Sequence, residues 1–412
     1  MSTPLVSFCI PTYQRSRYLE SLLTTLTQQL ADFAYPYEIV IADNASADDT
    51  PGVVAHFAAR LPIRSHRHAH NIGGFPNWQF VMSQARGRYI VYVSDDDSIL
   101  GPQVADTIAR MEADPDVVVV YAPWLLYDLV ADKPQGQFYQ VPRDLRIERG
   151  AHTELLDHIL RHHIFPEVQI VRRDALQRMQ PRINENAFFA FVHAADYLTQ
   201  GAVLIQRTPF YVAITNYFAD ETREQLGNQE VETAWDRYRG GLEYVLARAG
   251  AQVGPEERIG WLARIQQMIA VRMSVAIRLR HLGARNPIDT HVLALRLRGM
   301  GYENLLPVPM GVLASNAMLH FLLHDAELQR GMRQMLCVGP FDADLRGFLT
   351  THSPRPVELL AQLPSLDGVS DTLLLVAQAG VCPPVDDAAM QRNVRMLHLG
   401  DLLQRFGLQP TR

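Results

Sequence analysis

The chain is poor in several residue types whose abundance would indicate particular classes of protein. Only three of its 412 residues are cysteines, and they stand far apart at Cys9, Cys337 and Cys382. This spacing provides neither a disulfide framework nor a zinc site. Lys133 is the single lysine, so arginine supplies nearly all of the positive charge. A reducing compartment, the cytoplasm, is the simplest expectation.

Long apolar runs and a basic charge excess are also absent. No stretch of 18 apolar residues occurs, so no transmembrane helix is expected. Residues 1–5 lack the basic segment of a secretory signal, which is therefore not expected either. The net charge of −6 gives no general attraction to nucleic acid. With 48% apolar residues and 412 positions, the chain has material for two or three globular domains.

The first hundred residues alternate two kinds of hydrophobic pattern. Short apolar runs predict buried strands, and leucines at helical spacing predict helices between them. Such alternation indicates a parallel sheet with right-handed crossovers. The strands are expected at 6–10, 38–42 and 89–93, and the helices at 19–30 and 53–59. Further strands are expected at 117–121 and 168–172, and a helix at 152–163.

Two acidic loops follow predicted strands, "DNASADDT" at 43–50 and "SDDDS" at 94–98. Both therefore lie at the carboxyl edge of the sheet, where open α/β sheets bind ligands. Two carboxylates about 4 Å apart repel each other by roughly 4 kcal/mol at an effective dielectric near 20. Asp95, Asp96 and Asp97 must be solvated, partly protonated or neutralised by a cation. A divalent cation that also binds phosphate would suit them, and a solvated turn with N-cap aspartates is the structural alternative.

The order of several short motifs carries a stronger signal than any of them alone. "VSFCIPTYQRSRYLESLLTTL", "EIVIADNASADDT" and "HNIGGFPNWQFVMSQARGRYIVYVSDDDSILGP" follow one another between residues 5 and 102. Together they resemble the N-terminal half of family 2 glycosyltransferases, and residues 103–217 resemble the family more loosely. The resemblance implies a GT-A fold, a nucleotide-sugar donor, inverting transfer to a hydroxyl and a bound Mn²⁺ or Mg²⁺.

The same resemblance implies roles for individual residues. Asp97 would be the main metal ligand, with Asp96 beside it and His193 as a late ligand. Asp196, in "FFAFVHAADYLTQ", would be the catalytic base. The implied nucleotide-binding residues are Pro11, Thr12, Tyr13, Arg15, Asp43, Asn44, Ser46, Asn71, Gly73, Asp95 and Asp96, with Asn77 near the N-x-G turn.

Departures from the family pattern and structural alternatives accompany these roles. Ser94 stands where many members have aspartate, and Ala195 stands where an acid often precedes the base. Asp43 could instead form an Asx turn or cap a helix. Asp196 could be an ordinary acid in the first turn of a helix, and His193 a structural histidine.

Two positively charged or metal-ligating patterns have simpler interpretations. "HRHAH" places His66, His68 and His70 on one face of a strand, but no nearby carboxylate would orient the rings for a metal. Residues 256–298 carry eight arginines against three acids. Arginines that lie over the wet face of a helical bundle explain this excess, and contact with a lipid surface or polyanionic acceptor is the alternative.

The sequence thus predicts an α/β GT-A domain at 1–220, a helical domain at 221–330 and a small α/β domain at 331–412. The predicted function is metal-dependent transfer from a nucleotide sugar, UDP- or dTDP-linked, to a saccharide, lipid-linked intermediate, natural product or protein. A sugar nucleotidyltransferase is the second enzyme class, although "IPTYQRSRYL" lacks its glycine-rich loop and lysine. An inactive nucleotide- or partner-binding scaffold is the third interpretation. Peripheral membrane contact and self-association through the C-terminal region stay open.

Overall fold

The protein is described by a computed structural model that covers residues 3–179, 186–220, 231–283, 285–341, 343–363, 365–377 and 385–406. Its contacts divide the chain into two compact units. The N-terminal unit comprises residues 1–225 and 236–268, and the C-terminal unit comprises 226–235 and 269–412. Cys9 and Cys337 are buried free thiols, and Cys382 lies outside the described residues.

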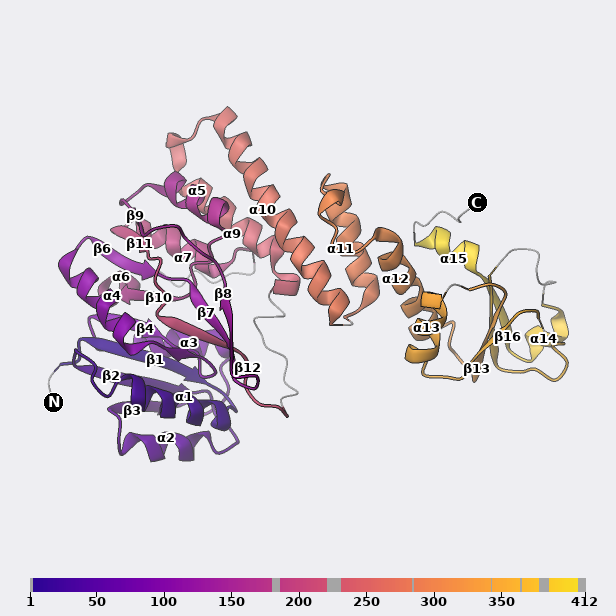
Figure 1. Cartoon of the computed structure of the whole chain (residues 1–412), viewed down its shortest axis with the longest axis horizontal. Coiled ribbons are helices and arrows are strands. Elements are labelled where there is room, and N and C mark those ends of the chain that lie inside the picture. Colours follow the sequence, from indigo (N-terminus) through magenta and orange to yellow (C-terminus); the bar gives the residue numbers. More distant parts are fainter. Residues whose placement is uncertain are drawn as a thin grey trace. The chain divides into compact units, whose positions relative to one another are not determined.

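A large, mainly parallel sheet forms the centre of the N-terminal unit (Figure 1). Strands β3, β2, β1 and β4 run parallel, β10 is antiparallel to both of its neighbours, and β6 and β11 are again parallel. The predicted α/β class with a mostly parallel sheet is confirmed. The spatial order is β3 (Ile63–Arg67), β2 (Tyr37–Asp43), β1 (Val6–Thr12), β4 (Tyr89–Tyr92), β10 (Gln169–Arg172), β6 (Val117–Tyr121), β11 (Ala202–Ile205) and β9 (Leu145–Ile147).

Apolar periodicity explains how the helices attach to this sheet. Helix α1 buries a leucine stripe, Leu19, Leu22, Leu23 and Leu26, and each buried leucine contributes about 1.5–3 kcal/mol. Helix α3, which the sequence patterns did not predict, packs on β1 and β2. The helices between residues 16 and 282 are α1 (Ser16–Gln29), α2 (Thr50–Ala58), α3 (Gly74–Ser83), α4 (Gly101–Ala113), α5 (His152–His162), α6 (Arg173–Arg178), α7 (Phe189–Leu198), α9 (Trp235–Arg248), η1 (Gly250–Gln252) and α10 (Pro255–Leu282).

A smaller sheet in the same unit connects the acidic loop to a distant part of the chain. Its order is β5 (Ser98–Ile99), β12 (Tyr211–Asn216), β7 (Trp124–Asp128) and β8 (Lys133–Gln137). Strand β5 begins immediately after Asp97 and pairs with β12, where Tyr211 lies opposite Ile99. The apolar stretch 202–217 therefore supplies strands to two different sheets, and its second strand reaches the acidic loop.

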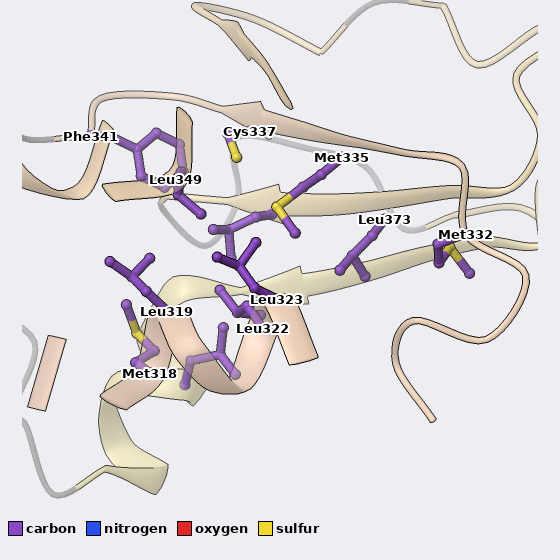
Figure 2. Close-up of a cluster of buried hydrophobic side chains, with 12 residues drawn as sticks. Met318, Leu319, Leu322, Leu323, Met332, Met335, Cys337, Phe341, Leu349 and Leu373 are labelled. Atoms are coloured by element: carbon purple, nitrogen blue, oxygen red, sulfur yellow. The ribbon is translucent and has the colours of Figure 1, made fainter. Parts of the chain in front are cut away.

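The C-terminal unit contains helices followed by a parallel sheet of its own. The strand order is β14 (Val357–Leu360), β13 (Gln334–Val338), β15 (Thr372–Val376) and β16 (Val394–His398). Figure 2 shows Met318, Leu319, Leu322 and Leu323 of α12 among the side chains of this sheet, in one buried cluster. The helices are α11 (Pro287–Gly299), η2 (Glu303–Leu305), α12 (Met310–His324), α13 (Ala343–His352), α14 (Asp387–Gln391) and α15 (Leu399–Arg405).

Two further sequence expectations can be compared with this structure. No described helix has both the length and the apolar character that crossing a bilayer requires. In the arginine-rich segment, Arg264 forms an ion pair of 2.7 Å with Asp157 and lies over the Trp261 ring. The division into three domains at residues 220 and 330 stays a prediction.

Candidate active site

The carboxyl ends of three parallel strands bring both predicted acidic loops to one edge of the sheet. Strands β1 and β2 end in register, with Thr12 opposite Asp43, and β4 pairs with β1 on the other side. Residues 95–97 follow β4 after Val93 and Ser94. The expectation that both acidic loops lie at this edge is therefore confirmed.

Arginine 15 neutralises two of the three adjacent carboxylates. Its Nη1 lies 2.5 Å from Oδ1 of Asp95 and 2.7 Å from Oδ2 of Asp96. The Arg15 side chain is 17% exposed and that of Asp95 only 4%. Burial raises the pKa of Asp95 to about 6, with Arg15 opposing and Asp96 adding to the shift. The Arg15 guanidinium therefore balances part of the negative charge of the three adjacent aspartates.

Asp97 is held by a different set of partners. The hydroxyl of Tyr211 donates to Oδ2 over 2.9 Å, and the backbone N–H of Ile214 donates to Oδ1 over 3.0 Å. Tyr211 in turn accepts a hydrogen bond from the N–H of Ser94. Burial and then the charge of Asp96 raise the pKa of Asp97 to about 8, against these two hydrogen bonds. Sequence patterns did not reveal Tyr211, because it lies more than a hundred residues away on an ordinary apolar strand.

The acidic cluster has the donor chemistry of a magnesium or manganese site. Within the described ranges, no group of three or more histidine, cysteine or acidic residues is arranged to hold a metal ion. Magnesium usually needs only one or two carboxylates plus substrate phosphates. Each oxygen of Asp97 has one hydrogen-bond partner here, which leaves a further lone pair on each. Burial and Asp96 disfavour the ionised form of Asp97, and a bound dication would stabilise that form, so the residues fit such an ion.

Asp43 presents a buried acceptor at the end of β2. Its Oδ1 accepts a hydrogen bond of 2.9 Å from the N–H of Ser46. Its Oδ2 lies 3.3 Å from Nε of Arg67 but makes no hydrogen bond with any described residue, although it is buried. An unsatisfied buried oxygen costs free energy, so this atom is suited to a hydrogen-bond donor from a ligand.

A network of side-chain amides shapes the turn next to Asp43. Asn44 is buried and donates to Oδ1 of Asn71 and to the carbonyl of Gly73. It also accepts from the N–H of Ile72. Gly73 adopts a φ of 95°, a conformation that favours glycine. Asn77 donates to the carbonyl of Ala42, so the predicted N-x-G turn is tied to the end of β2.

The loop after β1 is fixed by the loop after β2. Ser46 accepts a hydrogen bond of 2.8 Å from the N–H of Gln14. Gln14 and Ala45 have φ values of 52° and 64°, which are unfavourable for residues with side chains. Thr12 is buried and Pro11 is partly exposed, whereas Tyr13 is 40% exposed. The Tyr13 ring is therefore available to stack on a planar ligand.

The two residues predicted on α7 have partners outside the acidic cluster. Asp196 accepts a hydrogen bond of 2.8 Å from Tyr244 of α9, and Nε of Arg248 lies 3.8 Å away. His193 stacks on Trp78, and burial lowers its pKa to about 4, so the ring is neutral at pH 7. Trp78 also contacts the ring of Tyr92 at the end of β4. Ring contacts thus connect α7 to the strand that precedes the cluster.

Comparison with known proteins identifies the family of the N-terminal part of the chain. Residues 7–180 match the family model of glycosyl transferase family 2, so the chain carries a domain of that family in its N-terminal part. The resemblance predicted from the motifs is confirmed.

Particular relatives match the same part of the chain. Abequosyltransferase RfbV of Salmonella typhimurium is 34% identical over 115 residues, which are 27% of this chain and 34% of that protein. Protein Rv1520 of Mycobacterium tuberculosis is 32% identical over 114 residues, 27% of this chain and 32% of its own. The matched segment thus spans about a third of these curated relatives.

A solved structure covers more of the chain at lower identity. Staphylococcus aureus TarS, residues 1–349 in complex with UDP-GlcNAc, superposes with a TM-score of 0.45 and 16% identity. The alignment covers 73% of this chain and 90% of that one.

Proposed function

We propose that this protein is a metal-dependent, inverting glycosyltransferase that moves a sugar from a nucleotide sugar, UDP- or dTDP-linked, to an acceptor hydroxyl. The observation that supports this most is the pairing of two features at one sheet edge. Asp43 offers a buried acceptor oxygen that no described residue hydrogen-bonds, and a cluster of carboxylates follows the strand two places away. The first suits a base N–H and the second a diphosphate with its cation.

Donor binding would use the residues in two groups. Oδ2 of Asp43 would accept the ring N–H of a uracil-like base, and the exposed ring of Tyr13 would cover the base. Asn44 and Ser46 would act as positioning residues, because they hold the turns on either side. Asp97 and Asp96 would hold Mn²⁺ or Mg²⁺, which stabilises the charge that develops on a departing nucleoside diphosphate.

Transfer would proceed by in-line displacement. The acceptor oxygen attacks the anomeric carbon from the face opposite the diphosphate, a new C–O bond forms, and the bond to the phosphate oxygen breaks. The nucleoside diphosphate leaves, and a carboxylate takes the proton of the acceptor hydroxyl. Asp196 is the proposed base, and it would have to exchange its hydrogen bond with Tyr244 for one with the acceptor.

For the acceptor and the cellular location, we propose only a general class and a compartment. RfbV and TarS are named for transfer of abequose and of N-acetylglucosamine. For this chain we infer only that it transfers a sugar. The acceptor would be a saccharide, a lipid-linked intermediate, a natural product or a protein. Residues 181–412 lie outside the family match, so acceptor recognition is assigned there. We place the reaction in the cytoplasm.

Thermal stability with nucleotides tests this function directly. UDP, dTDP, GDP, CDP and ADP are each added with Mn²⁺, Mg²⁺ or EDTA. A nucleotide at 100 times its dissociation constant should stabilise the protein by about 2.7 kcal/mol. We expect one nucleotide to do so only with metal, and the effect to disappear in Asp97→Asn and to weaken in Asp43→Asn. Asp106→Asn, an exposed acid on α4, is the matched control.

Two results would contradict the proposal. Absence of any nucleotide effect on a folded protein would remove the transferase interpretation. Metal-dependent nucleotide binding without hydrolysis or transfer of any sugar would favour the inactive scaffold.

A further inference from the structure

The hydroxyl of Tyr211 joins the two ends of the turn that carries the proposed metal ligand. It accepts a hydrogen bond of 3.0 Å from the N–H of Ser94 and donates one of 2.9 Å to Oδ2 of Asp97. Within the turn, the N–H of Asp97 donates to the carbonyl of Ser94 over 3.3 Å. The phenol therefore fixes the backbone at the beginning of the turn and the carboxylate at its end.

The other carboxylate oxygen of Asp97 is bonded by the same strand. The N–H of Ile214 donates to Oδ1 over 3.0 Å, and both donors belong to β12. A carboxylate with one donor on each oxygen cannot turn about its Cβ–Cγ bond without losing a hydrogen bond. Strand β12 therefore sets the plane of this carboxylate, and a second lone pair on each oxygen is left for a cation.

Backbone pairing on both sides makes β12 a firm support for this contact. The strand pairs with β5, where Val212 lies opposite Ser98, and with β7 on its other side. The N–H of Leu100 donates to the carbonyl of Phe210 over 2.9 Å. Tyr211 is only 4% exposed, so its hydroxyl is shielded from competing water. Two segments 114 residues apart in the sequence are thus joined around Asp97.

The three adjacent aspartates are divided between two supports of different charge. Arg15 holds Asp95 and Asp96, whereas the described hydrogen-bond donors to the Asp97 carboxylate are an uncharged phenol and an uncharged amide. A guanidinium repels an incoming metal ion, but a neutral donor orients a carboxylate and leaves its charge to attract the ion. The arrangement therefore favours Asp97 as the carboxylate that is presented to a cation.

We infer that Tyr211 is a positioning residue that sets the affinity of the site for its divalent cation by orienting Asp97. This inference rests on the proposed function, in which Asp97 binds Mn²⁺ or Mg²⁺. Tyr211 lies beyond residue 180, where the family match ends. Loss of a side chain that orients a metal ligand typically weakens metal binding about 10- to 100-fold.

Binding of Mn²⁺ to the full-length protein, followed by the electron paramagnetic resonance signal of the free ion, tests this role. Titrations with Mn²⁺ alone, and with Mn²⁺ plus UDP or dTDP, are compared with protein-free blanks. Tyr211→Phe keeps the ring and removes the hydroxyl, so we expect it to weaken Mn²⁺ binding about 10- to 100-fold. Asp97→Asn should weaken it at least as much.

Tyr139→Phe is the matched control for this substitution. Its hydroxyl is similarly buried but hydrogen-bonds no described residue, so its removal should leave Mn²⁺ binding unchanged. Hydrogen exchange of the wild-type protein gives a second readout that needs no variant. Adding Mg²⁺ and nucleotide should slow exchange of the amides of Ser94 and Ile214, because the cation holds Asp97 in place. The amides of β15 should exchange at an unchanged rate.

The possible outcomes separate this inference from the proposed function. If Asp97→Asn loses Mn²⁺ but Tyr211→Phe binds it like the wild type, the inference is overturned and the function stands. Equal losses in Tyr211→Phe and Tyr139→Phe would assign the effect to packing and also overturn it. If Tyr211→Phe does not fold, unchanged exchange at Ser94 and Ile214 decides against the inference. A wild-type protein that binds no Mn²⁺, alone or with either nucleotide, would refute both together.

Discussion

Each unit contains a sheet with parallel central strands, and the residues at the carboxyl ends of those strands differ in polarity between the two units. At the N-terminal edge, Thr12, Asp43 and Asp95 are buried polar residues. At the corresponding edge of the C-terminal sheet, β13 and β15 end in Val338 and Val376, both fully buried. The ends of β1 and β2 and the loop after β4 thus carry buried polar groups, whereas β13 and β15 end in apolar ones.

Backbone packing explains the second edge. Gly339 follows β13 with a φ of 112°, and a Cβ at this position would lie 2.9 Å from that of Ala377. The N–H of Ala377 also donates to the carbonyl of Val338. The same backbone bond joins Asn44 to Thr12 in the N-terminal sheet, but there side chains such as Arg15 and Asn44 add polar contacts between the loops. Parallel topology offers a place for a site, and side chains decide whether one exists.

The largest loss of stability is expected from a substitution in the buried core of the C-terminal sheet. Leu375→Ala removes a fully buried side chain and should lower the free energy of unfolding of that unit by about 2–5 kcal/mol. Leu359→Ala, at a side chain that is 38% exposed, should cost less than about 1 kcal/mol. Urea unfolding followed by hydrogen exchange of the strand amides measures both. If Leu375→Ala also abolished nucleotide binding, the two sheets would not be separable as described.

A smaller loss in the free energy of unfolding is expected at the carboxyl edge of the N-terminal sheet. Arg15→Met leaves the buried Asp95 and its neighbour Asp96 without their cation, and should cost about 3 kcal/mol. Arg178→Met breaks an exposed pair with Asp174 and should cost about 0.3–0.5 kcal/mol. Urea unfolding in EDTA compares the two variants. Equal effects would mean that the internal cation does not stabilise the acidic cluster.

The smallest effect concerns a carboxylate buried between the strands of the N-terminal sheet. Burial alone would raise the pKa of Glu38, but hydrogen bonds from Ser7, Arg86 and Arg64 lower it below its ordinary value. The folded pKa is lower than the unfolded one, so this stability is present above about pH 4.5 and is lost as the pH falls further. Glu38→Gln should therefore flatten the acid side of the stability curve. A curve of unchanged shape would exclude Glu38 as its source.

Much of the N-terminal sheet could be predicted because its signals are local. Apolar runs at 6–10, 38–42 and 89–93 correspond to strands β1, β2 and β4, since buried parallel strands have continuous apolar sequences. Helix α3 was missed because its turn and its buried Asn77 do not form a simple apolar stripe. The proposed nucleotide-binding residues come from motif order, which periodicity alone does not provide.

The sequence by itself determined the positions of strands β1, β2 and β4, the position of both acidic loops and the family of the N-terminal domain. These follow from residue spacing over short distances, where hydrophobic period and turn chemistry act. Only the tertiary structure decided which cation neutralises Asp95 and Asp96, and that Tyr211 holds Asp97. Each of these depends on residues distant in sequence meeting in space, and their pairing is fixed by packing and burial rather than by any local pattern.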